Sequence, residues 1–221
     1  MKYKEAVKQF LGISEEQFHE RYNNAFARTH YEFKGLEFEY IEDWYKHTDS
    51  IIFEQAKKFV RFKREDWLNI VRKACETYNC QTILDYGGGI GCDSRNLAQD
   101  FDVTMVEIPS KTLNFAQYWN NTFTIRPNYW LLDQKFDCVI CFEVLECVSN
   151  PYELLKALSK HTTKILCVSS LFRTARGYTR ILRTNKNFGE FIELILRSLG
   201  FLEQTIFNER PGIIIIAKKG D

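Results

Sequence analysis

The sequence predicts an α/β protein whose mostly parallel sheet ends in an antiparallel hairpin and follows a helical N-terminal region. From Gln81 onward, short β-type runs alternate with helical segments, an order typical of a parallel sheet covered by helices on both faces. The preceding residues show helical periodicity instead. The last two β-type runs, 201–207 and 213–217, are joined by a connection too short for a crossover helix, so we expect them to pair antiparallel.

The N-terminal region is predicted to be a set of helices joined by short loops. Ser14 and Gln17 have the spacing of a capping box, which marks a helix start. Another helix is expected to begin near Thr48 or Ser50, and a further one near Glu65. The side chains expected on the buried faces of these last two helices are Ile52, Ala56, Phe59, Val60, Trp67, Leu68, Val71, Ala74 and Tyr78.

Capping residues mark the helices of the alternating part. Asn150, Pro151 and Glu153 are preferred types for the N-cap, the first and the third helical position. Asn187 is expected to cap the last helix and Gly200 to end it. The strands expected before the hairpin are 82–86, 103–107, 122–125, 136–142 and 164–169, and further helices are expected at 93–98 and after Ser110.

Composition and charge exclude several classes of protein. The formal net charge of +1 gives no overall attraction to nucleic acid or to anionic lipid. No apolar run is long enough to span a bilayer, and the first residues lack the apolar core of a signal peptide. Seven cysteines spread along the chain are not a secreted disulfide framework. We therefore expect a cytoplasmic protein with neither a membrane nor a nucleic acid as partner.

Cys138 and Cys141 form a CxxC pattern inside a predicted strand. Side chains three residues apart on a strand point to opposite faces of the sheet. The two thiols are therefore expected to be buried and reduced, and no metal site is predicted there.

The central motif is a run of four glycines in five positions, Gly87 to Gly91, between a predicted strand and a predicted helix. Glycines let the backbone turn tightly and approach a ligand closely. The helix N-terminus beyond them favours a negative group such as a carboxylate. Because a plain turn rarely needs so many glycines, the motif predicts a ligand-binding loop at the carboxyl edge of the sheet.

An acidic residue in the second strand complements this loop. Glu107 follows Gly87 by twenty residues, a position from which a carboxylate accepts both hydroxyls of a ribose. Two details favour S-adenosylmethionine (SAM) over NAD as the adenosine cofactor. Cys92 stands where the dinucleotide pattern requires its third glycine, and Asp85 suits a cofactor that carries an ammonium group.

These motifs resemble the class I SAM-dependent methyltransferase family and are similar to its branch that methylates small molecules. The likeness covers roughly residues 80 to 218 and rests on residues 83–91, Val106-Glu107, residues 136–148 and Pro151. The resemblance implies a Rossmann-like, seven-stranded, mostly parallel sheet with an antiparallel last strand. Residues 81–221 would form the SAM-binding domain, and residues 1–80 a helical extension that acts as a lid.

The resemblance also implies which residues bind the cofactor. The glycines would line its methionine part, Glu107 would hold the ribose, and Phe142 would lie beside the sulfonium. The residues expected to bind SAM, or its product S-adenosylhomocysteine (SAH), are Asp85, Gly87, Gly88, Gly89, Gly91, Glu107, Ile108 and Phe142. Cys147 departs from the pattern, because that branch often has histidine at this position.

Transfer of a methyl group from a sulfonium is a direct displacement, and a base is needed only if the acceptor must lose a proton. No histidine follows His161, so a histidine base after the fifth strand is not available. Glu143 and Glu146 lie at the end of the fourth strand, and His47 lies in an aromatic segment suited to cover the cofactor. These three are the candidate catalytic residues, with cofactor positioning as the alternative role of Glu143.

The predicted acceptor is a small molecule, and no metal is expected to take part because no acid follows the fifth strand. Arg173 and Arg176 belong to a basic run after that strand, which either binds an anionic acceptor or forms a solvated face. Tyr45 either packs in the core or contacts the acceptor. A peptide, protein or RNA methyltransferase, a non-catalytic SAM-binding protein and a nicotinamide oxidoreductase are the alternatives.

Overall fold

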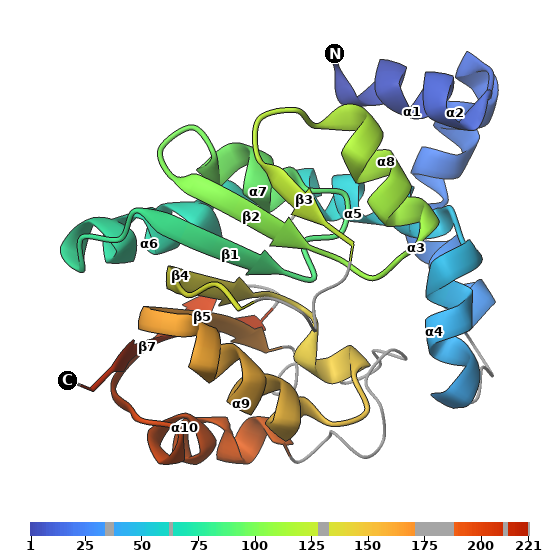
Figure 1. The fold of residues 1–221 in the computed structure, drawn as a ribbon. Helices are drawn as coiled ribbons and strands as arrows, with labels where there is room; N and C mark the ends of the chain where they lie inside the picture. Colours follow the sequence, from blue (N-terminus) through green and yellow to red (C-terminus); the bar gives the residue numbers. More distant parts are fainter. Residues whose placement is uncertain (34–37, 62–63, 128–132, 171–187, 210–211, 221) are drawn as a thin grey trace.

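The computed structural model describes residues 1–33, 38–61, 64–127, 133–170, 188–209 and 212–220. Arg173, Arg176 and Asn187 lie outside these residues. The helical N-terminal region is confirmed, and its described residues form six helices, which Figure 1 labels. They are α1 (Tyr3–Leu11), α2 (Glu15–Asn23), α3 (Ala25–Phe33), α4 (Phe38–His47), α5 (Ser50–Arg61) and α6 (Arg64–Thr77).

Local sequence explains where these helices begin. The predicted capping box is present: Gln17 N donates to Ser14 Oγ, and Ser14 N donates to Gln17 Oε1. The start of α5 at Ser50 is also confirmed. The predicted buried face of α5 is wrong at one position, because Val60 is 72% exposed. Val60 lies two turns after the buried Phe53, so burial of this face ends before the last turn.

The alternating part forms a seven-stranded sheet in the order β3-β2-β1-β4-β5-β7-β6. The strands from β1 to β5 pair in parallel, whereas β7 runs antiparallel to both of its neighbours. The predicted fold class and the closing hairpin are therefore confirmed. The strands are β1 (Thr82–Tyr86), β2 (Asp102–Val106), β3 (Thr124–Arg126), β4 (Phe136–Cys141), β5 (Thr162–Ser170), β6 (Phe201–Glu209) and β7 (Gly212–Lys219).

Two of the connecting helices begin at the predicted residues, whereas the helix predicted at 93–98 begins one residue earlier, at Cys92. Asn150 caps its helix through a hydrogen bond from Glu153 N, Ser110 caps another, and Gly200 adopts a φ of 90° after the last helix. The helices are α7 (Cys92–Leu97), α8 (Lys111–Trp119), α9 (Pro151–His161) and α10 (Phe188–Ser198), with a short 3-10 helix, η2 (Leu145–Cys147).

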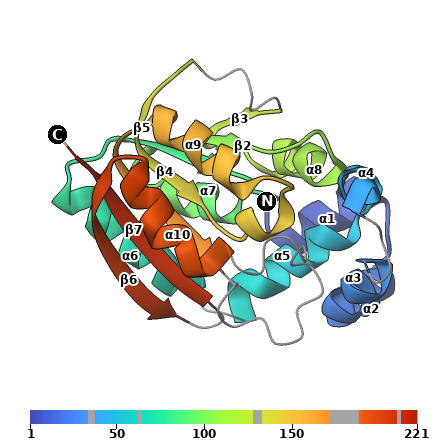
Figure 2. The same ribbon diagram turned by 90° about the horizontal axis from the view of Figure 1, so that it is seen from below.

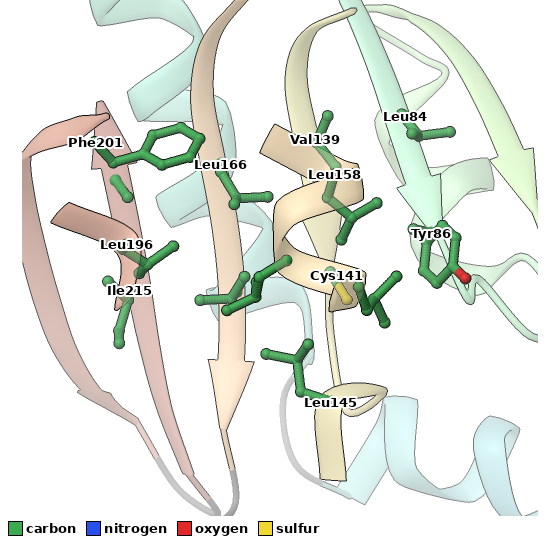
Figure 3. Close-up of a cluster of buried hydrophobic side chains, with 14 of the residues drawn as sticks. Leu84, Tyr86, Val139, Cys141, Leu145, Leu158, Leu166, Leu196, Phe201 and Ile215 are labelled. Atoms are coloured by element: carbon green, nitrogen blue, oxygen red, sulfur yellow. The ribbon is translucent and has the colours of Figure 1, made fainter. Parts of the chain in front are cut away.

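Two apolar clusters lie on the opposite faces of the sheet. One joins the sheet to α9 and α10 and includes Cys141, Leu158 and Leu196 (Figure 3). The other joins it to α6 and α7 and includes Cys138 and Trp67. The two cysteines of the CxxC pattern thus face opposite sides, as predicted, and all seven cysteines are free.

The helices α1 to α4 extend the molecule at one end of the sheet (Figure 1). The α1 helix packs beside α8 (Figure 1), where Tyr3 and Phe10 contact Phe115 through edge-on ring contacts. The α5 helix extends from α3 toward α6 (Figure 2). This path takes α5 past the carboxyl ends of the central strands, where its polar side chains meet the glycine loop.

Candidate active site

The glycine loop connects β1 to α7 at the carboxyl edge of the sheet. Gly87 N and Gly88 N both donate to Val106 O, at 2.8 and 3.4 Å, which ties the loop to the end of β2. Gly87, Gly89 and Gly91 have φ values of 75°, 59° and 79°, in the left-handed region that favours glycine. A Cβ on Gly87 would lie 2.4 Å from Val144 Cγ2. The loop therefore requires its glycines for both conformation and space.

Two carboxyl groups lie beside the loop, one at the end of β1 and one after β2. Asp85, at the end of β1, is buried and accepts a hydrogen bond from Ser94 Oγ. Burial, together with the charge of Asp93, raises its pKa to about 7. Glu107 follows β2; its Oε2 accepts from Gly89 N at 2.7 Å, and its Oε1 accepts from Ile108 N at 2.9 Å. Burial raises the pKa of Glu107 to about 7 as well.

We expect Glu107→Gln to weaken SAM binding by about 5- to 30-fold, because a charged acceptor forms hydrogen bonds stronger by ~1–2 kcal/mol than a neutral one. In the wild type, affinity should rise as pH rises through about 7, where Glu107 ionises. In Glu107→Gln, only the pH dependence of SAM affinity that comes from Asp85 should remain. Calorimetry from pH 6 to 8 measures both effects, with Glu76→Gln on the exposed side of α6 as control. Equal affinities for Glu107→Gln and wild type would exclude the role.

The end of β4 presents an aromatic ring and a carboxylate. Phe142 is 6% exposed, and its ring packs edge-on against Trp67 at a centroid distance of 5.8 Å. The Arg64 guanidinium lies over both rings, 4.9 Å from the Phe142 centroid and 4.5 Å from that of Trp67. Arg64 also binds Asp93 through a two-donor fork. This edge of the site thus combines an aromatic surface with fixed charge.

Glu143 has a φ of 58°, which is unusual for a residue other than glycine. Its backbone N donates to Ser169 Oγ at 2.9 Å, and its Oε2 lies 3.0 Å from Lys58 Nζ. Burial opposes ionisation, but the charges of Lys58 and Arg64 hold the pKa of Glu143 below its usual range. Glu143 is therefore a carboxylate at neutral pH.

Glu146, one turn after Glu143, has a raised pKa instead of a lowered one. It is 2% exposed, and within the described parts of the chain neither carboxyl oxygen has a hydrogen-bond partner. Burial, followed by the charge of Glu143, raises its pKa to about 8. The end of β4 therefore holds one ionised carboxylate and one carboxylic acid that is protonated at neutral pH.

We expect this acid to lower stability as pH rises. Between its unfolded pKa of 4.5 and its folded pKa of about 8, the folded state keeps a proton that the unfolded state has released. For Glu146 alone, the free energy of unfolding should therefore fall with pH in this window by up to ~1.4 kcal/mol per pH unit. The raised pKa values of Asp85 and Glu107 add to this slope below about pH 7. Glu146→Gln should therefore reduce the slope in urea unfolding from pH 5 to 8 without abolishing it, whereas Glu153→Gln, in the exposed first turn of α9, should leave it unchanged. An unchanged slope would mean that Glu146 is ionised.

The structure brings most of the predicted site residues to one edge of the sheet. The four glycines form the loop, which is bordered by Asp85, Glu107 and Ile108. The end of β4 carries Phe142, Glu143 and Glu146. Tyr45 Oη donates to Cys147 Sγ at 3.8 Å, so α4 also contacts this end. His47 is exposed, and its described hydrogen bond is with Asp43 O in its own helix. The structure does not bring His47 to Glu143.

Sequence reasoning missed the contribution of α5. Gln55 Oε1 accepts from Ile90 N at 2.8 Å and lies against Gly89, whereas Lys58 pairs with Glu143. A usable signal was present: Glu54 and Lys58 are spaced one turn apart beside the apolar face of α5. Polar residues that border an apolar face at helical spacing indicate a buried polar contact.

The described residues contain neither a metal-ligand cluster nor a membrane-spanning helix. No group of three or more His, Cys, Asp or Glu side chains among them has a geometry that could hold a metal ion. None of their helices is both long and apolar enough to cross a bilayer.

A family model described as a methyltransferase domain matches residues 52–177, more than half of the chain. The chain belongs to this methyltransferase family. The predicted resemblance is thereby confirmed. The match begins inside α5, so the family region includes α6 and most of α5, which lie before the predicted boundary at residue 80. That boundary and the lid role of residues 1–80 stay predictions.

Curated relatives of this methyltransferase-family chain include ubiquinone biosynthesis O-methyltransferases. The protein from Rickettsia bellii (strain OSU 85-389) is 32% identical over 106 residues, 43% of this chain and 44% of that protein. The protein from Rickettsia akari (strain Hartford) is 29% identical over 123 residues, 49% of each. The matched stretch thus spans less than half the length of these relatives.

Solved structures confirm the fold. The magnesium protoporphyrin IX methyltransferase of Synechocystis PCC 6803 with bound SAH superposes with a TM-score of 0.57 at 21% identity, over 75% of this chain and 87% of that one. The same enzyme with bound SAM matches over 100% of this chain and 98% of that one, at 18% identity and a TM-score of 0.57.

Proposed function

We propose that this protein is a SAM-dependent methyltransferase that transfers a methyl group to a small-molecule acceptor. One observation carries the proposal: a left-handed glycine loop at the carboxyl edge of the sheet, with the Glu107 carboxylate bonded across it. An open loop of this kind suits the amino-acid part of a cofactor, and an adjoining carboxylate suits a ribose. Family membership supports the same cofactor.

The residues present fit SAM in the chemistry of their hydrogen-bonding and charged groups. The methionine part would lie along Gly87, Gly88, Gly89 and Gly91, above Asp85, and the ribose against Glu107 and Ile108. A Cβ at Gly88 would lie 2.5 Å from Met105 Cγ, so the loop packs closely on the end of β2 at this position and only glycine fits there. When bound, SAM supplies an electrophilic methyl carbon and a neutral thioether leaving group.

The end of β4 supplies the acceptor side of the site. Phe142 would face the sulfonium, whose positive charge an aromatic ring attracts. Glu143 would accept the proton of the acceptor's hydroxyl group while the hydroxyl oxygen forms the bond to the methyl carbon. The electron pair of the broken C–S bond would stay on sulfur. Oxygen is the proposed acceptor atom because the curated relatives are O-methyltransferases.

Three finer assignments belong to the same proposal. Arg173 and Arg176 would bind an anionic group of the acceptor, on the support of sequence alone, and His47 would act only if α4 closed over the cofactor. Tyr45 would line the acceptor side through its contact with Cys147. Seven free cysteines support a reducing compartment, and we place the protein in the cytoplasm.

Calorimetry with SAM, SAH and NADH tests the cofactor. We expect SAM and SAH to bind and NADH not to bind; the reverse pattern would overturn the proposal. Release of SAH is then measured with 3,4-dihydroxybenzoate, a monohydric phenol, an aliphatic amine and a short basic peptide as acceptors. Turnover with a hydroxyl acceptor supports the assignment, whereas turnover only with the peptide would move the protein to another substrate class.

A further inference from the structure

The α5 helix reaches the end of β4 through one lysine. Lys58 Nζ lies 3.0 Å from Glu143 Oε2, across 85 residues of sequence, and 3.4 Å from Glu54 Oε1, one turn earlier in α5. The side chains of Lys58 and Glu143 are 18% and 17% exposed, and that of Glu54 is 3% exposed. Because solvent screens them little, these charges form a largely buried network.

Glu143 is fixed from two directions. Its backbone has a left-handed φ, which is unfavourable for a residue with a side chain. The backbone N is bonded to Ser169 Oγ in β5, and the carboxylate is bonded to Lys58 in α5. Strained residues of this kind persist only where their surroundings determine them, and they gather at functional sites.

A buried ion pair is a poor source of net stability, since desolvation offsets much of its attraction. Stability alone therefore does not account for a lysine placed opposite the strained carboxylate. We propose that Lys58 is a positioning residue: it holds the carboxylate of Glu143 at the acceptor side of the site, and Glu54 in turn holds its ammonium group. The inference rests on the proposed function, which places Glu143 beside the acceptor.

Several other charged or titratable groups lie near Glu143 or near Lys58. Arg64 of α6 and Glu146 and Cys147 of η2 interact with Glu143. Glu54 of α5 and Tyr45 of α4 interact with Lys58. Arg64 also favours the ionised form of Glu143, but it is engaged in the fork to Asp93. Among the described residues, Lys58 is the cation in direct contact with Glu143, so its removal should have a larger effect than loss of Arg64.

The test is a titration of Glu143 that requires no acceptor. The whole chain is labelled with ¹³C at glutamate side-chain carboxyls, and the Glu143 signal is assigned from its absence in Glu143→Gln. In Lys58→Met and Lys58→Gln, we expect the pKa of Glu143 to rise by about 1 to 3 pH units, the usual effect of losing an adjacent opposite charge. Lys58→Arg should restore at least half of this change, because it restores the charge.

Lys57→Met is the matched control. Lys57 is the neighbouring residue of the same helix, but its ammonium bonds the carbonyls of Tyr22 and Asn23. It should leave the Glu143 titration unchanged. If Lys58→Gln left the pKa of Glu143 unchanged, or if Lys58→Arg failed to restore it in a folded protein, the positioning role would be rejected. SAH affinity should stay within about 2-fold in all variants; absent SAH binding in the wild type would instead contradict the proposed function.

Discussion

Gly89→Val is expected to weaken SAM binding by at least about 100-fold, a loss of ~2.7 kcal/mol or more. Gly89 has a φ of 59°, and its N donates to Glu107. A Cβ at this position would lie 2.1 Å from Gln55 Oε1, which itself accepts from Ile90 N. A branched side chain would therefore occupy the proposed methionine subsite, displace Gln55 and disturb the hydrogen bond to Glu107. Calorimetry with SAM measures the loss.

A second glycine separates loss of binding from backbone strain. Gly12 has a φ of 63°, nearly that of Gly89, and a Cβ there would meet nothing within 4 Å. Gly12→Val should therefore lower the melting temperature through backbone strain alone, since it also places a side chain on left-handed backbone but displaces no neighbour. It should bind SAM normally. Normal SAM affinity in a folded Gly89→Val variant would contradict the assignment of the loop.

The fold was predictable because its signals are local and repeated. Capping residues such as Ser14 and Asn150 mark helix starts through hydrogen bonds with residues three positions away. The hairpin followed from the short connection between β6 and β7, which excludes a crossover. The exposure of Val60 was not predictable in this way, because the apolar pattern of a helix does not show how far along the helix other elements pack against it.

In the candidate site, too, local sequence predicted some residues and the fold alone brings the others together. The glycine loop and Glu107 are close in sequence to the strands that carry them, so spacing alone placed them together. Lys58 and Glu143 are far apart in sequence, and their contact depends on how α5 crosses the strand ends. The ionisation of Glu143 and Glu146 was likewise out of reach, because it depends on burial and on neighbours that only the fold supplies.

Glu143→Gln is expected to lower kcat by about 10²- to 10⁴-fold with a hydroxyl acceptor, the usual contribution of a general base. The amide keeps nearly the same size, so it keeps the packing at the end of β4 but cannot take the proton. SAM affinity should change little, because the described side-chain hydrogen bonds to the glycine loop come from Gln55, Glu107 and Asn120 and not from Glu143. SAH release with the most active hydroxyl acceptor measures the effect.

The dependence of this activity on pH distinguishes a base from a residue that only packs. A base works when ionised, and Lys58 and Arg64 hold the pKa of Glu143 below its usual range. Wild-type kcat should therefore stay level as pH falls to about 5 and decline only below the ordinary value for glutamate of about 4.3. Glu203→Gln, which removes an exposed carboxylate paired with Lys218, should leave rate and profile unchanged. A Glu143→Gln variant with wild-type kcat would show that the acceptor loses its proton to another group, or carries none to lose.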